Sequence, residues 1–242
     1  MNTENNKIYI FAHISKTGGT TLRHHFIKYM KEHFDFVHLA KKGNKAAVAA
    51  GLLAFEERST SEMENIKVII GHKVNMDTGL YFKNKTINKI VTFRNPETWL
   101  PSRYNQRMNR RVAQGKRVIS LGNWLETPEP FFSQFNWLIA QYYKFGASHK
   151  KLSSNQIYDL IMNNISEFSK IFFLETLDDQ IIQVCNELSI PHTLERKNIT
   201  GIEKVNYLEN NEAEQEIISD FIQNDLILFN DVKKYATSYN LL

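Results

Sequence analysis

The chain has 242 residues, of which 42% are hydrophobic and 12% aromatic, so it holds enough apolar material for one large core. Its 30 Lys and Arg residues outnumber its 26 Asp and Glu residues, and the net charge of +4 is too small to indicate a nucleic-acid partner. The single cysteine, Cys185, excludes an internal disulfide and a cysteine-based metal cluster. No Gly/Ser/Pro-rich linker divides the sequence, so we predict one domain over residues 1–242.

The N-terminal segment is polar and leads directly into an apolar stretch. It has neither the basic region nor the apolar run of a secretory signal, and the chain contains no apolar stretch of membrane-spanning length. We therefore expect a soluble cytoplasmic protein of prokaryotic type with no membrane partner.

Short apolar strands alternate with longer helical stretches along the chain. This alternation implies crossover connections and therefore a parallel sheet covered by helices on both faces, an α/β fold. Strands are predicted near 7–13, 66–71, 89–93 and 170–174, with a further strand at 34–39, and helices near 19–32, 45–58, 97–112, 131–145, 154–168, 176–188 and 211–237.

The first strand runs into a turn, Lys-Thr-Gly-Gly-Thr-Thr, that opens a helix. Its glycines can adopt positive φ, while the first amides of the helix and the positive end of its dipole face the same point. The lysine precedes the glycines, so the turn is not a Walker A loop. The pattern predicts a phosphate-type ligand, although an ordinary strand–turn–helix connection would use the same residues. The ligand-binding candidates are Lys16, Thr17, Gly18, Gly19, Thr20 and Thr21.

A second anion site is predicted after the strand near 89–93. Arg94 stands at the end of this strand, and Ser102 lies eight residues later, within the next helix. A planar guanidinium and a hydroxyl group suit phosphate oxygens. Taken alone, Arg94 is as well explained as a surface arginine, but together with the first turn it indicates a ligand with two anionic ends.

The two motifs resemble those of sulfotransferases that use 3′-phosphoadenosine 5′-phosphosulfate (PAPS), in particular carbohydrate sulfotransferases of the heparan 2-O and Golgi type. Residues 13–22 are similar to the 5′-phosphosulfate loop of that family, with Ser15 where proline is usual. Residues 93–96 and 102–104 are similar to its 3′-phosphate motif, with Asn95 where aspartate is frequent. Weaker similarities occur at 68–72, 172–177 and 196–198, so the resemblance covers most of the chain.

The resemblance implies a P-loop-like, nucleotide kinase-like sulfotransferase fold, PAPS as co-substrate, 3′,5′-adenosine bisphosphate as product and no metal. It also implies that Asn198 contacts the nucleotide. Because sulfuryl transfer resembles phosphoryl transfer, with charge gathering on the leaving oxygen, we expect Lys16 to neutralise that oxygen and the following turn to hold the 5′ end. Arg94 and Ser102 would then hold the 3′-phosphate.

An attacking hydroxyl group needs a base that is neutral near pH 7. His72 follows Gly71 just beyond a predicted strand, and ligands of open α/β sheets bind outside the carboxyl ends of the strands. We predict His72 as the catalytic base, with His13 as the second candidate and Glu175 as an orienting residue or base. A hydrogen-bonded structural histidine would explain His72 almost as well.

Two features after the 3′-phosphate motif are candidates for acceptor binding. Arg103 and Arg107, with Arg110 and Arg111, fall on one helix face, which fits an acidic glycan but is more simply a solvated face. Trp124 is the aromatic residue that we assign to a sugar ring. Its neighbours around 132–135 have helical spacing and are predicted to belong to the core.

These observations predict an enzyme that transfers a sulfuryl group from PAPS to a hydroxyl group, most simply on a carbohydrate. Two alternatives stay open. A P-loop nucleotide or small-molecule kinase would need a strand ending in a magnesium-binding aspartate, which the sequence does not obviously offer. A non-catalytic nucleotide- or glycan-binding protein would have no use for both a lysine and a histidine at one transferable group. The sequence determines neither the acceptor nor the oligomeric state.

Overall fold

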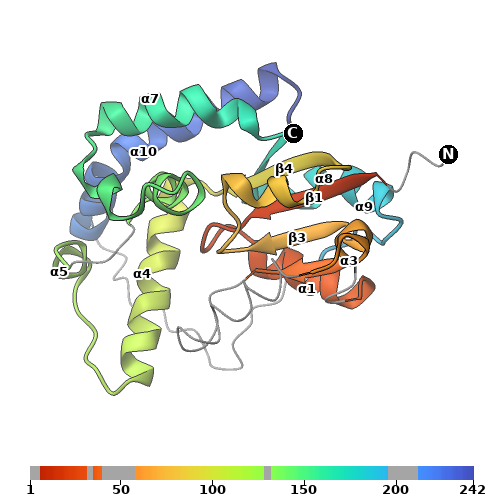
Figure 1. Ribbon diagram of the computed structural model, residues 1–242. Helices are drawn as coiled ribbons and strands as arrows, with labels where there is room; N and C mark the ends of the chain where they lie inside the picture. The colour runs from red at the N-terminus through yellow and green to blue at the C-terminus, as the bar shows by residue number, and fades with distance from the viewer. Residues whose placement is uncertain (1–5, 32–34, 40–57, 128–131, 196–211) are drawn as a thin grey trace.

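The protein has an α/β fold around one sheet of five strands, in the order β2-β3-β1-β4-β5. The computed structural model describes residues 6–31, 35–39, 58–127, 132–195 and 212–242. Every neighbouring pair of strands is parallel, as the strand–helix alternation predicts (Figure 1). The strands are β1 (Lys7–Ala12), β2 (Phe36–His38), β3 (Val68–Gly71), β4 (Thr86–Phe93) and β5 (Lys170–Phe173).

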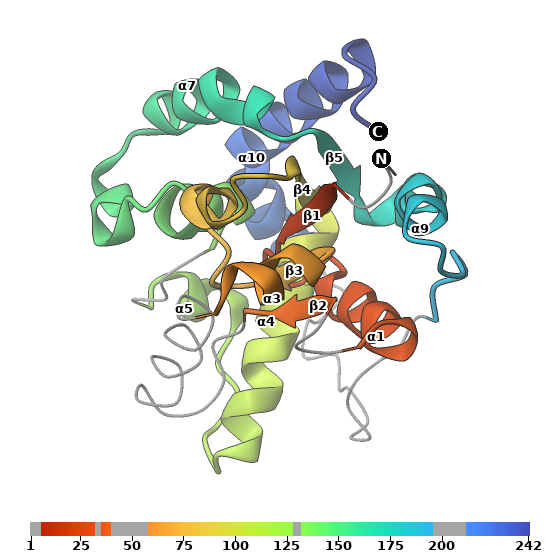
Figure 2. The ribbon, with the colours of Figure 1, turned by 45° about the vertical axis from the view of Figure 1, so that its right-hand side comes forward.

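Both faces of the sheet are buried under helices. Successive side chains of a strand point to opposite faces, so each strand contributes to both cores. In β1, Ile8 and Ile10 face one core cluster and Tyr9 and Phe11 face the other. One face packs on α1, α8 and α9, and the other on α6, α7 and the C-terminal half of α10 (Figure 2). These helices are α1 (Gly19–Tyr29), α6 (Gln134–Trp137), α7 (Ser154–Asn164), α8 (Leu177–Gln180), α9 (Ile182–Glu187) and α10 (Glu212–Ser238).

Helix α4 (Pro96–Ala113) extends away from the sheet edge at which the strands end (Figure 1). A third cluster joins it to α5 (Leu121–Leu125) and to the first half of α10, through residues such as Tyr104 and Ile222. The remaining elements are α3 (Thr60–Asn65) and the short turns η2 (Met76–Tyr81), η3 (Leu138–Tyr142), η4 (Gly146–Lys151), η5 (Ile165–Glu167) and η6 (Leu174–Thr176). Within the described ranges, no helix is both long and apolar enough to cross a membrane.

The prediction of one helix over 131–145 is wrong. Ser133 accepts hydrogen bonds from the amides of Phe135 and Asn136, so α6 begins only at Gln134. After one turn of α6 the backbone widens into the π turn η3. The predicted helix over 176–188 is likewise divided into α8 and α9. The helix predicted near 45–58 lies almost entirely outside the described residues.

Candidate active site

The ends of β1 and β4 lie side by side at the centre of the sheet. The chain continues from β1 to β2 on one side of β1 and from β4 to β5 on the other side. Connections that diverge from neighbouring parallel strands leave a crevice at their carboxyl ends, where open α/β sheets bind ligands. The two predicted anion motifs follow these two strands, so the topology brings them together.

The turn after β1 has the backbone geometry of an anion site. Gly18 is the N-cap of α1 and lies in the left-handed region at φ 90°, and Lys16 also has a positive φ of 72°. Among the described residues, no side chain caps the start of α1, and its first turn holds no acidic residue. The first amides of the helix are therefore left to a ligand, with the positive end of the helix dipole behind them.

Two hydrogen bonds fix the conformation of this turn. The Thr17 hydroxyl group donates to the carbonyl oxygen of Ile14 at 3.0 Å, and its side chain is buried. The indole of Trp99, in α4, donates to the carbonyl oxygen of Ser15 at 2.8 Å. The Thr17 hydroxyl thus braces the turn, and only its backbone amide remains for the ligand role predicted for it. The role of Trp99 was not predicted from the sequence, where it is one more apolar residue of an amphipathic helix.

Arg94 is fixed at the end of β4 by its backbone and its side chain. Gln134 accepts from the Arg94 amide at 3.0 Å and donates to the Arg94 carbonyl oxygen at 2.6 Å. The guanidinium Nε donates to Thr98 at 2.8 Å, and Nη1 lies 3.5 Å from the carbonyl oxygen of Lys16. Burial lowers the pKa of Arg94 and the Glu175 carboxylate opposes this, but an arginine stays protonated at neutral pH.

Two further residues complete the surroundings of Arg94. Glu175 accepts from the amide of Asn95 at 2.9 Å, so its carboxylate holds the turn after β4. Ser102 lies one helical turn beyond Thr98 on the same side of α4, next along the helix from the group that holds the guanidinium. Gln134 is fully buried and was not predicted from the sequence, where its one visible signal is a polar residue within an aromatic run.

His72 lies just beyond β3 with one ring nitrogen paired. Its Nδ1 is 2.6 Å from the carbonyl oxygen of His13. A carbonyl oxygen only accepts, so Nδ1 carries the proton and the lone pair of a neutral ring is on Nε2. Burial is the main cause that lowers the pKa of His72, with smaller contributions from Arg103 and Arg110, while the bond to His13 opposes the shift. His72 is therefore a neutral imidazole near pH 7, as a base must be.

His13 stacks on His72. The ring centroids are 4.1 Å apart and the planes differ by 20°. Its side chain is 9% exposed, and Nδ1 is buried without a hydrogen-bond partner among the described residues. Burial is the largest cause that holds the pKa of His13 well below its usual value, followed by the positive charge of Arg23 and the charge that His72 and His38 would carry if protonated.

The predicted acceptor residues separate into two groups. Arg103 and Arg107 are partly exposed on α4, and the charge of Arg103 acts on His72, so the basic face and the candidate base belong to one region. Trp124 is 1% exposed and packs edge-to-face against Tyr104 and Phe132. The prediction that Trp124 contacts a sugar ring is therefore wrong, because its indole belongs to the core between α4, α5 and α10. Asn198 lies outside the described residues.

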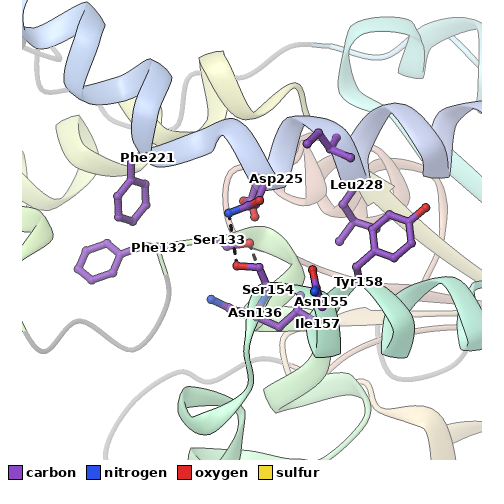
Figure 3. A pocket seen from close by; sticks show the side chains of 12 residues that line it. Phe132, Ser133, Asn136, Ser154, Asn155, Ile157, Tyr158, Phe221, Asp225 and Leu228 are labelled. Carbon is purple, nitrogen blue, oxygen red and sulfur yellow. Dashed lines mark hydrogen bonds between the residues drawn. The ribbon is translucent and has the colours of Figure 1, made fainter.

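A pocket of about 310 Å³ lies between α6, α7 and α10, away from these residues. Figure 3 shows Phe132 and Phe221 on one side of it and Asp225 near Ser133. None of the predicted site residues is among the described residues that line it. In the described part of the chain, no cluster of His, Cys, Asp or Glu is suited to a metal ion.

No protein-family model and no curated protein matches the sequence. Among solved structures, the chain is similar to a sulfotransferase from Alicyclobacillus acidocaldarius, with a TM-score of 0.45 and 12% identity over 93% of this chain and 95% of the other. It is also similar to the mouse sulfotransferase SULT7A1 complexed with PAP, with a TM-score of 0.43 and 11% identity over 97% of this chain and 89% of the other. At these TM-scores the likeness does not by itself assign an activity.

Proposed function

We propose that the protein is a PAPS-dependent sulfotransferase with a hydroxyl group of a carbohydrate as its acceptor. The observation that carries the proposal is the convergence of three groups at one edge of the sheet. The uncapped start of α1 and Arg94 follow adjacent strands, and the neutral His72 follows the strand on the other side of β1. Two anion sites and a base suit a donor with two anionic ends and an acceptor hydroxyl group.

The residues present fit PAPS. The amides of Gly19 to Thr21 and the ammonium group of Lys16 would hold its 5′ end, because the first turn of α1 holds no acid and no side chain in the described part of the chain caps it. Arg94 and Ser102 would hold the 3′-phosphate. The guanidinium is already oriented by Thr98, so little side-chain entropy is lost when it binds.

PAPS supplies the sulfuryl group. His72 presents the lone pair of Nε2 and accepts the proton of the acceptor hydroxyl group, while its Nδ1 proton stays on the carbonyl oxygen of His13. Lys16 places a positive charge where the donor's 5′ end is held, which stabilises negative charge on the leaving oxygen. Asn198 keeps its proposed role as a nucleotide contact.

The acceptor that this site suits best is an acidic carbohydrate. Two arginines of α4, Arg103 and Arg110, act electrostatically on the ring of His72. A basic surface beside the base raises the local concentration of an anionic acceptor. Arg107 lies between these two arginines on the same helix face, so we assign Arg103 and Arg107 to acceptor binding.

The proposal is tested by incubating the protein with labelled PAPS and a panel of acceptors that contains neutral, uronate-bearing and already sulfated glycans, together with simple phenols. We expect label in an acidic glycan and loss of transfer in Lys16→Ala. The Arg117→Ala variant is the matched control, since Arg117 is an exposed cation outside the proposed site. Transfer to phenols alone would overturn the carbohydrate assignment, and transfer by Lys16→Ala at the wild-type rate would overturn the role of Lys16.

A further inference from the structure

We propose that His13 is a positioning residue whose imidazole, wedged between the first residue of α1 and the ring of His72, fixes the base against the phosphate-binding turn. The inference rests on the proposed function of His72 as base. It replaces the earlier suggestion that His13 is itself an alternative base.

The first support is the fit of the ring against α1. A methyl group on Gly19 would lie 2.0 Å from Cδ2 of His13 and 2.3 Å from its Nε2. The imidazole therefore occupies the space that any other residue at position 19 would fill. It also stacks on His72 at a centroid distance of 4.1 Å, so one flat ring contacts both the turn and the base.

The second support is that the backbone of the same residue also holds His72. The His13 amide donates to the carbonyl oxygen of Gly71 at 3.3 Å, and the His13 carbonyl oxygen accepts from His72 Nδ1 at 2.6 Å. Carbonyl and ring together fix both the tautomer and the plane of His72. The indole of Trp137 meets the His72 ring edge-to-face at a centroid distance of 6.2 Å.

The third support is that His13 is poorly placed to move protons. Its Nδ1 is buried and has no hydrogen-bond partner within the described part of the chain. The titratable groups that face the pair are Arg23 on α1, His38 on β2, and Arg103 and Arg110 on α4. All of them are cations or bases, so they oppose protonation of either ring, and desolvation acts in the same direction.

These contacts define what the ring contributes. A flat apolar-faced ring excludes water from one face of His72 and holds Nε2 in one direction. Removing the ring would admit water and let His72 rotate about its remaining bond to the carbonyl oxygen. We therefore expect the pKa of His72 to rise toward its ordinary value and kcat to fall, because small misplacement of a catalytic group is costly.

The test compares His13→Ala, which removes the ring, with His13→Phe, which restores a flat ring that cannot titrate. Imidazole ¹⁵N NMR of the full chain gives the tautomer and pKa of His72 without any acceptor. We expect a raised His72 pKa in H13A and a pKa near the wild-type value in H13F. With an accepted substrate, H13A should lose on the order of tenfold to a hundredfold in kcat, with the acid limb of its pH profile shifted to higher pH, and H13F should recover part of that loss.

Two results would overturn the inference. An H13F variant as inactive as H13A, with both melting normally and binding 3′,5′-adenosine bisphosphate, would make His13 a proton-transfer group. An unchanged His72 pKa in H13A would show that the ring does not control the base. If H13A does not fold, His13→Leu takes its place, since it fills the volume without a flat face and carries the same expected loss. Because the NMR measurement needs no turnover, it judges this inference even if the proposed function fails.

Discussion

Replacing Gly19 by Ala tests how tightly the phosphate-binding turn is packed. Gly19 is the first residue of α1, and its φ is not in the left-handed region, so an alanine would meet no backbone strain there. Its methyl group would, however, lie 2.0, 2.3 and 2.4 Å from three ring atoms of His13. Ordinary carbon contacts are about 3.5–4.0 Å, so the ring or the turn must move by roughly 1.5 Å.

The magnitude follows from two opposing effects. Forcing an extra methyl group into packed surroundings costs about 1–3 kcal/mol, and the upper half of this range applies because the ring is held by His72 on its far side. Alanine in place of glycine in a helix returns about 0.5–1 kcal/mol. We expect a net loss of about 1–2.5 kcal/mol in the free energy of unfolding, which for a chain of this size lowers Tm by about 2–10 °C.

The assay is a thermal melt followed by circular dichroism, with Gly122→Ala as the control. Gly122 lies within α5, has no positive φ, and a methyl group there would meet no atom of the described residues within 4 Å. We expect the control to melt at or slightly above the wild-type temperature, because only the helix-propensity gain remains. A G19A variant that melts with or above the control would refute the packing of His13 on the turn.

The remaining predictions concern the catalytic base, the 3′ anion site and the pocket between α6, α7 and α10. His72→Ala should lower kcat by about a hundredfold or more and leave the binding of 3′,5′-adenosine bisphosphate nearly intact, so loss of nucleotide binding or retained turnover would contradict the role of His72 as base. In the wild type, the lowered pKa of His72 should keep the rate high at pH values below the usual titration range of histidine. Arg94→Lys should weaken the binding of 3′,5′-adenosine bisphosphate by about tenfold or more in calorimetry, because an ammonium group cannot contact Thr98 and the ligand at once as the planar guanidinium group does. Arg117→Lys, at an exposed site, should leave this binding unchanged. Burial raises the pKa of Asp225 to about 6, so the stability that its protonated carboxyl group contributes is fully present below about pH 4 and is lost as pH rises through about 6. Thermal melts should show a loss of at most about 3 kcal/mol in the free energy of unfolding over this range, and Asp225→Asn should not show it. Equal pH dependence in both proteins would refute the burial of this carboxyl group.

The sheet could be predicted from the sequence because its strands are buried on both faces. Parallel strands of this kind appear as short continuous apolar runs, and the run Ile8–Phe11 is apolar on both faces of β1. The start of α1 was equally visible, since two adjacent glycines after a strand require a tight turn. The break at Ser133 was missed because a capping serine inside an aromatic run does not disturb the apolar pattern.

The candidate site could be predicted only in part. The positions of Lys16, Arg94 and His72 follow from strand ends, which are local features of the sequence. The contacts that fix them come from distant segments: Gln134 holds Arg94 across 40 positions, and Trp99 holds Ser15 across 84. The burial of Trp124 depends on the packing of α4 against α10, which the periodicity of either helix alone does not reveal.

The proposed function requires that the ends of β1 and β4 bind a donor with anionic groups at both its 5′ and 3′ positions. Isothermal titration with 3′,5′-adenosine bisphosphate, and separately with ATP and Mg²⁺, tests it most directly, because neither ligand requires knowledge of the acceptor. We expect binding of the bisphosphate by the wild-type protein, strong weakening in Arg94→Ala and no comparable binding of ATP with Mg²⁺. Binding of ATP with Mg²⁺ in preference to the bisphosphate would rule out this donor site and favour a kinase.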